Sequence, residues 1–442
     1  MSAFRTPSLL ALGALLISAL QLQAGTWTLD QALAAARQNN PDVRLARLRI
    51  EAAQAMEQQA GAGALPQVSV SGGYSASNRA MPAFGSILNQ RAFNPTLDFN
   101  RPGTVDDLSL SGTVSYSLYS GGRVTAGRNA ARAGLQAAEL DSQAAEQQLS
   151  AAVVRAYLSV RQAREALAAV EAGVKAQEAS LAVAQARFDA GQLLKADLLN
   201  LEVQVAQLRE LQASARHRAA LVARAFLLLL GEGKEATVEL PAQDSSLEAL
   251  ALPASFAPDL RPELAAMQAR CRAAEEQLRA ARGGRQPSVN AFASYGFNHG
   301  WQSARNAEGW VAGVSVDLKV FDGGQTQGQI RQARAELAQA QELLRKLQLG
   351  ISLEIEQARL ANADAAERLQ VSTRTVSQAE ESAQLSRARF EKGALLSADL
   401  IGVESRLLEA RLRRSMAEAE ERSSLAELRR AAGLPLFEAA KP

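Results

Sequence analysis

A long internal repeat constrains this chain of 442 residues more than any other feature of its sequence. Residues 186–199 recur at 388–401 with nine of fourteen residues identical, at an offset of 202. At the same offset, the Gly-Gly segment 119–123 lies over 321–325. Further upstream the offset is 221, so the first copy carries 19 extra residues before its Gly-Gly pair. Ordered matches with one consistent insertion predict a duplicated module of about 200 residues.

Both copies have the same predicted order: helix, strand, loop, strand, very long helix, glycine turn and helix. A first helix is expected over 29–60, since Pro66 cannot continue it. The first repeat is predicted at 25–231, with strands at about 66–75 and 107–119 and helices at 122–188 and 194–230. An equatorial linker follows at 232–259. The second repeat is predicted at 260–433, with strands at about 287–298 and 309–321 and helices at 324–390 and 397–432, and a C-terminal tail follows at 434–442.

The first 24 residues are typical of a secretory signal peptide. Arg5 precedes an apolar run over 9–20, and cleavage is expected after Ala24. The run has 12 residues, whereas a membrane-spanning helix needs about 20. Gly25 rather than Cys follows the expected cut, so no lipid anchor is indicated there. The sequence therefore predicts an exported protein.

The four predicted strands alternate apolar and small polar residues, which puts each kind on one face. A soluble hairpin with one wet face would show the same alternation. However, twelve of the twenty aromatic residues fall within 66–119 and 287–321, as expected for girdles at a membrane interface. Strands of about ten residues also suit a tilted membrane crossing. Because unpaired strand edges are costly in lipid, we expect an oligomer: two chains would give eight strands and three would give twelve.

Seven-residue apolar spacing over 153–188 and 194–229 predicts supercoiled helices. A soluble antiparallel coiled coil would explain this spacing but not the strands. The formal net charge of +2 argues against nucleic acid as a partner. One Cys and two His leave little basis for a metal site, and we expect neither an enzyme nor a cofactor.

The two copies of the most similar segment mark the places where the long helices reverse. Gly191 and Gly393 are expected to end the long helices as C-terminal caps. Asp197 and Asp399 then lie in the first turn of the next helix, where the helix dipole favours a carboxylate. A capping role and a role in a pore both remain open for these two residues.

The signal peptide, the duplicated module, the paired reversal segments and the two Gly-Gly strand exits together resemble the TolC family of outer-membrane efflux and secretion channels. The resemblance implies a mainly α-helical homotrimer with a transmembrane 12-stranded β-barrel, continued by a long periplasmic α-helical barrel. It further implies a passive exit duct in the outer membrane of a Gram-negative bacterium, in a tripartite efflux pump or type I secretion system. Expected partners are outer-membrane lipid, a periplasmic adaptor (membrane fusion) protein and an inner-membrane transporter of the RND or ABC type.

By position, the resemblance places Asp399 where family members carry an acidic ring at the closed periplasmic tip. Phe390 and Leu395 replace the Tyr and Arg of the best-known closing contacts, so we expect apolar closure by Leu395 or Leu396. Lys195 is expected to form an ionic contact with Asp197. The residues assigned to the tip turns and to adaptor docking are Arg187, Phe188, Gly191, Lys195, Asp197, Arg389 and Gly393.

Two other classes of protein share some of these features. A periplasmic coiled-coil adaptor would also be exported, but it would need compact β domains rather than long alternating strands. A structural periplasmic rod would need no amphipathic strands. Extraction with the outer-membrane fraction distinguishes a channel from both.

Overall fold

The computed structural model describes residues 26–98, 100–233, 238–242, 244 and 261–434. The expected signal peptide, most of the expected linker and almost all of the expected tail lie outside these residues. In the part of the chain described, no helix is both long and apolar enough to cross a membrane. By its internal contacts the chain divides into two units, and each contains parts of both repeats. Unit 1 comprises 1–39, 153–249 and 372–419; unit 2 comprises 40–152, 250–371 and 420–442.

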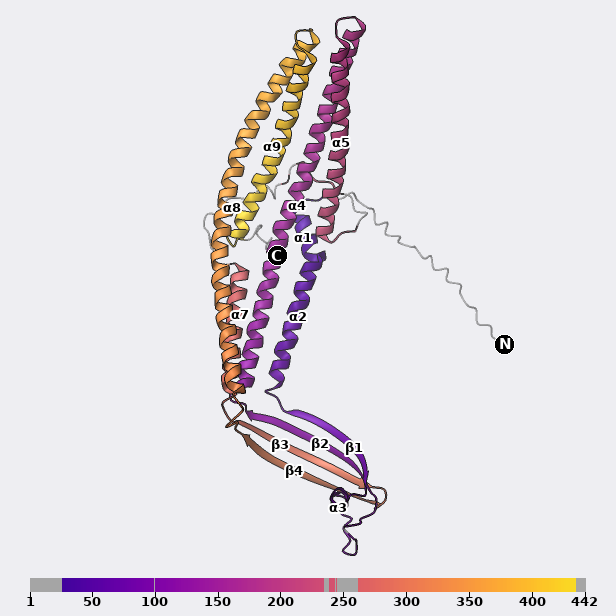
Figure 1. Cartoon of the computed structure of the whole chain (residues 1–442), viewed down its shortest axis with the longest axis vertical. Coiled ribbons are helices and arrows are strands. Elements are labelled where there is room, and N and C mark those ends of the chain that lie inside the picture. Colours follow the sequence, from indigo (N-terminus) through magenta and orange to yellow (C-terminus); the bar gives the residue numbers. More distant parts are fainter. Residues whose placement is uncertain (1–25, 99, 234–237, 243, 245–260, 435–442) are drawn as a thin grey trace, which may run out of the picture. The chain divides into compact units, whose positions relative to one another are not determined.

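Unit 2 contains one antiparallel sheet whose four strands follow each other in sequence order (Figure 1). The strands are β1 (Gln67–Ser77), β2 (Val105–Tyr119), β3 (Ser288–Gly300) and β4 (Arg305–Asp317). The pairing of β2 with β3 joins the two repeats into a single sheet. The fourth strand starts and ends four residues earlier than the sequence predicted, because β3 and β4 pair continuously up to a turn at 301–304.

The strand register confirms the predicted division of the sheet into two faces. Val70, Leu108 and Tyr295 project from one face, which we call the apolar face. Ser71, Thr113 and Ser294 alternate with them on the other, which we call the polar face. Apolar side chains are left open to the surroundings, with Val70 82% and Trp310 79% exposed. An exposed apolar sheet face is what a lipid environment requires.

The single first helix predicted over 29–60 is wrong, because the structure has α1 (Leu29–Asn39) and α2 (Pro41–Ala62). Pro41 disfavours helical geometry at the residue before it, and Asn40 accordingly has a ψ of 130°. The Asn40 side chain then accepts a hydrogen bond of 2.7 Å from the Asp42 N–H group. Asn40 therefore acts as the N-cap of α2. In the second repeat, α7 (Pro262–Gly283) also starts at a proline.

The insertion in the first repeat folds into a further short helix, α3 (Ala80–Asn89), which was not predicted. It lies between β1 and β2 and packs at the strand ends farthest from α2 (Figure 1). Ala83 and Ile87 are its buried side chains.

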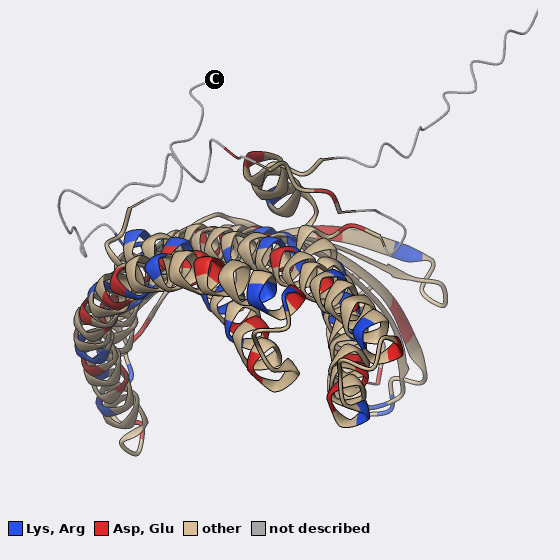
Figure 2. Ribbon diagram, turned by 90° about the horizontal axis from the view of Figure 1, so that it is seen from above, with Lys and Arg blue, Asp and Glu red and all other residues tan. Residues whose placement is uncertain are grey.

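The long helices are α4 (Arg123–Asp189) and α8 (Gln325–Glu391), each of 67 residues. Each follows a Gly-Gly pair with positive φ angles, such as 65° at Gly121 and 63° at Gly323. The return helices are α5 (Lys195–Leu230) and α9 (Ser397–Ala431). Acidic and basic residues are interspersed along the helices rather than gathered by sign (Figure 2).

Candidate functional site

The tips of the two helical hairpins lie in unit 1 and are closed by the same turn. Gly191 and Gly393 have φ angles of 70° and 75°, which a residue with a Cβ rarely adopts. The N–H groups of Gly191 and Gly393 donate at 2.9 Å to the carbonyl oxygens of Phe188 and Phe390. In each tip, the backbone N–H group of the residue after the glycine donates to the backbone carbonyl oxygen of the residue before the phenylalanine. The acceptor is Arg187 in the first tip, at 2.8 Å, and Arg389 in the second, at 2.9 Å. This pattern caps both long helices, as their glycines predicted.

A buried apolar cluster joins the two tips. Its members, from α4, α5, α8 and α9, are Ala184, Leu198, Leu201, Phe390 and Leu400. Phe390 is 1% exposed, whereas its counterpart Phe188 is only partly buried against the same cluster. Leu395 also packs against it from the second turn. The two hairpins are therefore one packed body at the tip.

Two polar contacts reinforce this packing, and the sequence did not predict either of them. The Arg187 guanidinium donates to the backbone carbonyl of Phe390 at 3.1 Å and lies 5.6 Å from the Phe390 ring centroid. The Ser397 hydroxyl is fully buried and donates to the Asp197 carboxylate at 2.7 Å. We call these two contacts the tip latch. Their residues are 203 and 200 positions apart, close to the offset of 202 that relates the repeats.

The remaining predicted site residues are exposed. Asp399 lies in the first turn of α9, and no bond to its side chain is recorded within the described residues. Leu396 is 66% exposed beside it. Lys195 and Arg389 are also exposed. The predicted ionic contact between Lys195 and Asp197 is not among the ion pairs of the described residues, and Asp197 accepts from Ser397 instead.

Below the tip, polar groups interrupt the packing of unit 1. Arg387 on α8 forms a two-pronged ion pair with Glu404 on α9, one N–O distance being 2.7 Å. This hydrogen bonding raises the pKa of Arg387 above its usual value. Gln177 on α4 is 1% exposed, and its amide has no hydrogen-bond partner in the described part of the chain. It lies between Val174 of one apolar cluster and Leu181 of the next.

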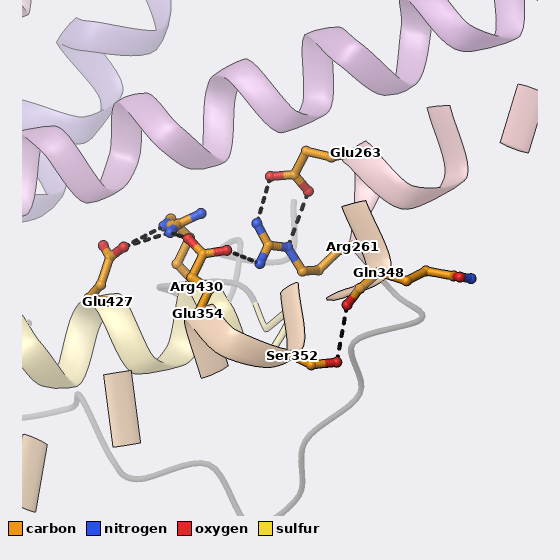
Figure 3. Close-up of polar contacts among 7 residues, drawn as sticks. All are labelled: Arg261, Glu263, Gln348, Ser352, Glu354, Glu427 and Arg430. Carbon is orange, nitrogen blue, oxygen red and sulfur yellow. Dashed lines mark hydrogen bonds and ion pairs between the residues drawn. The ribbon is translucent and has the colours of Figure 1, made fainter. Parts of the chain in front are cut away.

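Unit 2 holds a second cluster of charged side chains, where α7 begins and α9 ends (Figure 3). Glu354 on α8 pairs with both Arg261 and Arg430, and these two arginines also bond Glu263 and Glu427. Burial would raise the pKa of Glu354, but the two arginines lower it below its usual value. Burial would likewise lower the pKa of Arg261, but its carboxylate partners raise it. The cluster fastens three helices, α7, α8 and α9.

Within the described residues, no group of His, Cys, Asp and Glu side chains is placed to hold a metal ion. What the geometry does offer is a sheet with one apolar and one polar face in unit 2. In unit 1 it offers a pair of packed helical hairpins with exposed carboxylates and leucines at their tips.

Comparisons with known proteins agree with this geometry. The model of the outer membrane efflux protein family matches residues 15–232 and 256–434. Nodulation protein T of Rhizobium leguminosarum bv. trifolii is 25% identical over 381 residues, covering 82% of this chain and 76% of that protein.

Two solved structures show the same fold. The CmeC outer membrane channel of Campylobacter jejuni matches with a TM-score of 0.81 at 17% identity, covering 94% of this chain and 87% of that chain. The open state of the MtrE outer membrane channel of Neisseria gonorrhoeae matches with a TM-score of 0.76 at 18% identity, covering 96% and 95%. The chain therefore belongs to the outer membrane efflux protein family, as an efflux duct of the outer membrane with the TolC-like fold.

Proposed function

We propose that the tips of three chains form the closed periplasmic end of this duct and that an adaptor protein opens it. The observation that supports this best is the exposure of Asp399 and Leu396 directly beside the buried tip latch. Members of the family work as channels of tripartite pumps. The proposed partners of this duct are a periplasmic adaptor and an inner-membrane transporter of the RND or ABC type, and the assembly would serve efflux or type I secretion.

Leu395 and Leu396 supply the apolar part of this closure. Leu396 is largely exposed in a single chain, while Leu395 packs against the tip cluster and holds the turn that carries it. Three copies of such a turn around an axis form a narrow apolar constriction, and such constrictions stop ions by expelling water. Phe390 supports the constriction from inside the tip, since its ring is buried.

Asp399 supplies the electrostatic part. Its carboxylate is exposed, and three copies converging on an axis would concentrate negative potential in a low-dielectric passage. The duct would then prefer cations at rest, and multivalent cations would bind at the ring and block it.

The exposed tip surface is the proposed docking site of the adaptor. It contains Lys195, Arg389 and the turn glycines Gly191 and Gly393. Arg187 and Asp197 hold the latch beneath this surface, and Phe188 packs beside it. An adaptor that binds the two turns more tightly when they are apart would shift the tip towards its open state.

The resting current of the protein reconstituted in a planar bilayer tests the apolar closure. The double variant Leu395→Ser/Leu396→Ser is expected to raise resting conductance, because hydroxyl groups let water stay in the constriction. The counterpart Leu193→Ser/Leu194→Ser is the matched control, since the proposal gives that pair no part in closure. An equal rise in both variants, or none in the first, contradicts apolar closure by Leu395 and Leu396.

The same recordings test the acidic ring. Asp399→Ala is expected to weaken block by multivalent cations and to reduce cation preference. Glu391→Ala, at the exposed end of α8, is the control for loss of a nearby carboxylate. Unchanged block in Asp399→Ala would remove Asp399 from the gate.

A further inference from the structure

The two faces of the sheet define which side of unit 2 lines the duct. In an outer-membrane protein, lipid contacts the apolar face and the opposite face lines the interior. The polar face fits an interior lining, since its hydroxyl groups bond across the strands. Ser71 and Ser111 are 2.8 Å apart, and Thr113 and Ser294 are 3.0 Å apart.

The insertion carrying α3 lies on this polar, duct-lining face. Asp107 and Asn298 project from the polar face, and Asp107 accepts a hydrogen bond of 3.0 Å from the Gln90 amide. Gly300 lies on the same face, and a Cβ placed there would collide with the Gln90 side chain. Ala307, which is also on the polar face, is only 8% exposed. The insertion therefore crosses the inner surface of the sheet rather than its lipid side.

Gln90 fixes the insertion in this position. Its side chain is fully buried and all its polar groups are used. The amide N–H groups donate to the Asp106 carbonyl at 2.6 Å and to the Asp107 carboxylate, and its amide oxygen accepts from Ser303 at 2.7 Å. The Asp106 carboxylate in turn accepts from the Trp301 N–H group at 2.9 Å. One residue thus joins the insertion, the start of β2 and the β3–β4 turn.

The strand ends that α3 covers are those farthest from the periplasmic helices, so they form the outer mouth of the duct. The ten residues of α3 include no charged side chain. Ala83 and Ile87 face the sheet, whereas Met81 is 80% exposed and Leu88 is 46% exposed. Since α3 lies on the duct side, its exposed side chains face the passage.

We propose that α3 forms an apolar constriction at the extracellular mouth, held closed by Gln90. In the trimer, three copies of α3 line the exit, so cargo leaving the duct passes an uncharged collar that limits the size of polar solutes. The proposal for this constriction and the proposal for the tip gate do not depend on each other.

Cysteine accessibility in intact cells tests this proposal without opening the tip. In a Cys271→Ser background, Ser115→Cys places a thiol on the polar face, deeper in the duct than α3. A graded series of maleimides, from small to polyethylene glycol-linked, is added outside the cells. The largest reagent that still labels the thiol gives the size cutoff of the mouth.

The shortened variant replaces residues 78–104 with the four-residue turn that joins β3 to β4, Trp301–Ala304. We expect its cutoff to be larger than that of the full chain. Gln90→Ala, which frees the insertion without removing it, is expected to raise the cutoff as well. Gln302→Cys, exposed in the turn between β3 and β4 at the same end of the sheet, is the control and should react with every reagent in all variants.

An equal cutoff in the full and shortened chains, with the control thiol labelled in both, would overturn the constriction. If the size cutoff is larger in the shortened chain but unchanged in Gln90→Ala, the role of Gln90 would be overturned. Neither result bears on the tip gate, because reagent added outside reaches Ser115→Cys without passing it.

Discussion

The two repeats have the same elements in the same order but use equivalent residues differently. At the tips, Arg187 reaches across to the second repeat, whereas its counterpart Arg389 is exposed. Phe390 is buried, whereas Phe188 is only partly so. Asp197 accepts a hydrogen bond from Ser397, whereas Asp399 is left open. Duplication therefore supplied two similar turns, and packing assigned one residue of each pair to the latch and the other to the surface.

The same divergence occurs away from the tips. Glu354 pairs with Arg430 in unit 2, and the corresponding first-repeat positions hold Ala152 and Leu228. The ion pair of Glu354 with Arg430 therefore has no counterpart at the equivalent positions of the first repeat. The buried Gln177 likewise corresponds to Ala379 in the second repeat. Each difference gives a matched pair of positions at which the comparison can be tested.

The largest effect is expected at the paired phenylalanines. Phe390→Ala should destabilise the tip by about 3–5 kcal/mol, since a fully buried aromatic ring leaves a cavity. Phe188→Ala should cost clearly less, because that ring is only partly buried. Hydrogen exchange of the amides in the tip turns measures the free energy of local opening in each variant. Equal losses in the free energy of local opening for the two variants would mean that the two tips are packed alike.

The paired arginines come next. Arg187→Ala removes a charge-assisted hydrogen bond and a cation–π contact, which together are worth roughly 2–4 kcal/mol at most. We expect faster tip exchange and a higher resting conductance. Arg389→Ala should change resting conductance less, because its guanidinium is exposed. A larger conductance change from Arg389→Ala would reverse the assignment of the latch.

Gln177→Leu is expected to stabilise unit 1 by about 1 kcal/mol. A buried amide without partners costs free energy, and a leucine of similar size fills the space without that cost. The control is Gln378→Leu, where the wild-type side chain lines an open surface groove between α8 and α9. Thermal unfolding of both variants gives the comparison. A loss of stability in Gln177→Leu would show that the amide is satisfied in the folded protein.

The smallest effect concerns pH and the charged cluster of unit 2. The pKa of Glu354 in the folded chain lies below its usual value of 4.5. Its ion pairs therefore stabilise the fold fully above that value, and the contribution is lost as pH falls through the lower folded pKa. Glu354→Gln should lower stability at neutral pH and flatten this acid-dependent loss. Glu367→Gln, at an exposed carboxylate on the same helix outside the cluster, is the control for the loss of one carboxylate.

Much of the fold followed from the sequence because local chemistry dictates it. Alternation over β1–β4 and seven-residue spacing along α4 and α5 depend only on neighbouring residues. The glycines 191 and 393 ended the long helices within one residue of the prediction, because a positive φ is a local requirement. The break at Asn40 was missed, although Pro41 and the capping amide were both signals for it.

The sequence by itself determined the duplicated order of elements, the amphipathic strands and the positions of the reversals. Only the tertiary structure decided that Phe390 rather than Phe188 is buried, that Ser397 bonds Asp197, and that Gln90 holds α3 against the polar face. Each of these depends on segments far apart in the chain meeting in space. A pattern read along one segment contains no information about the partner that another segment brings to it.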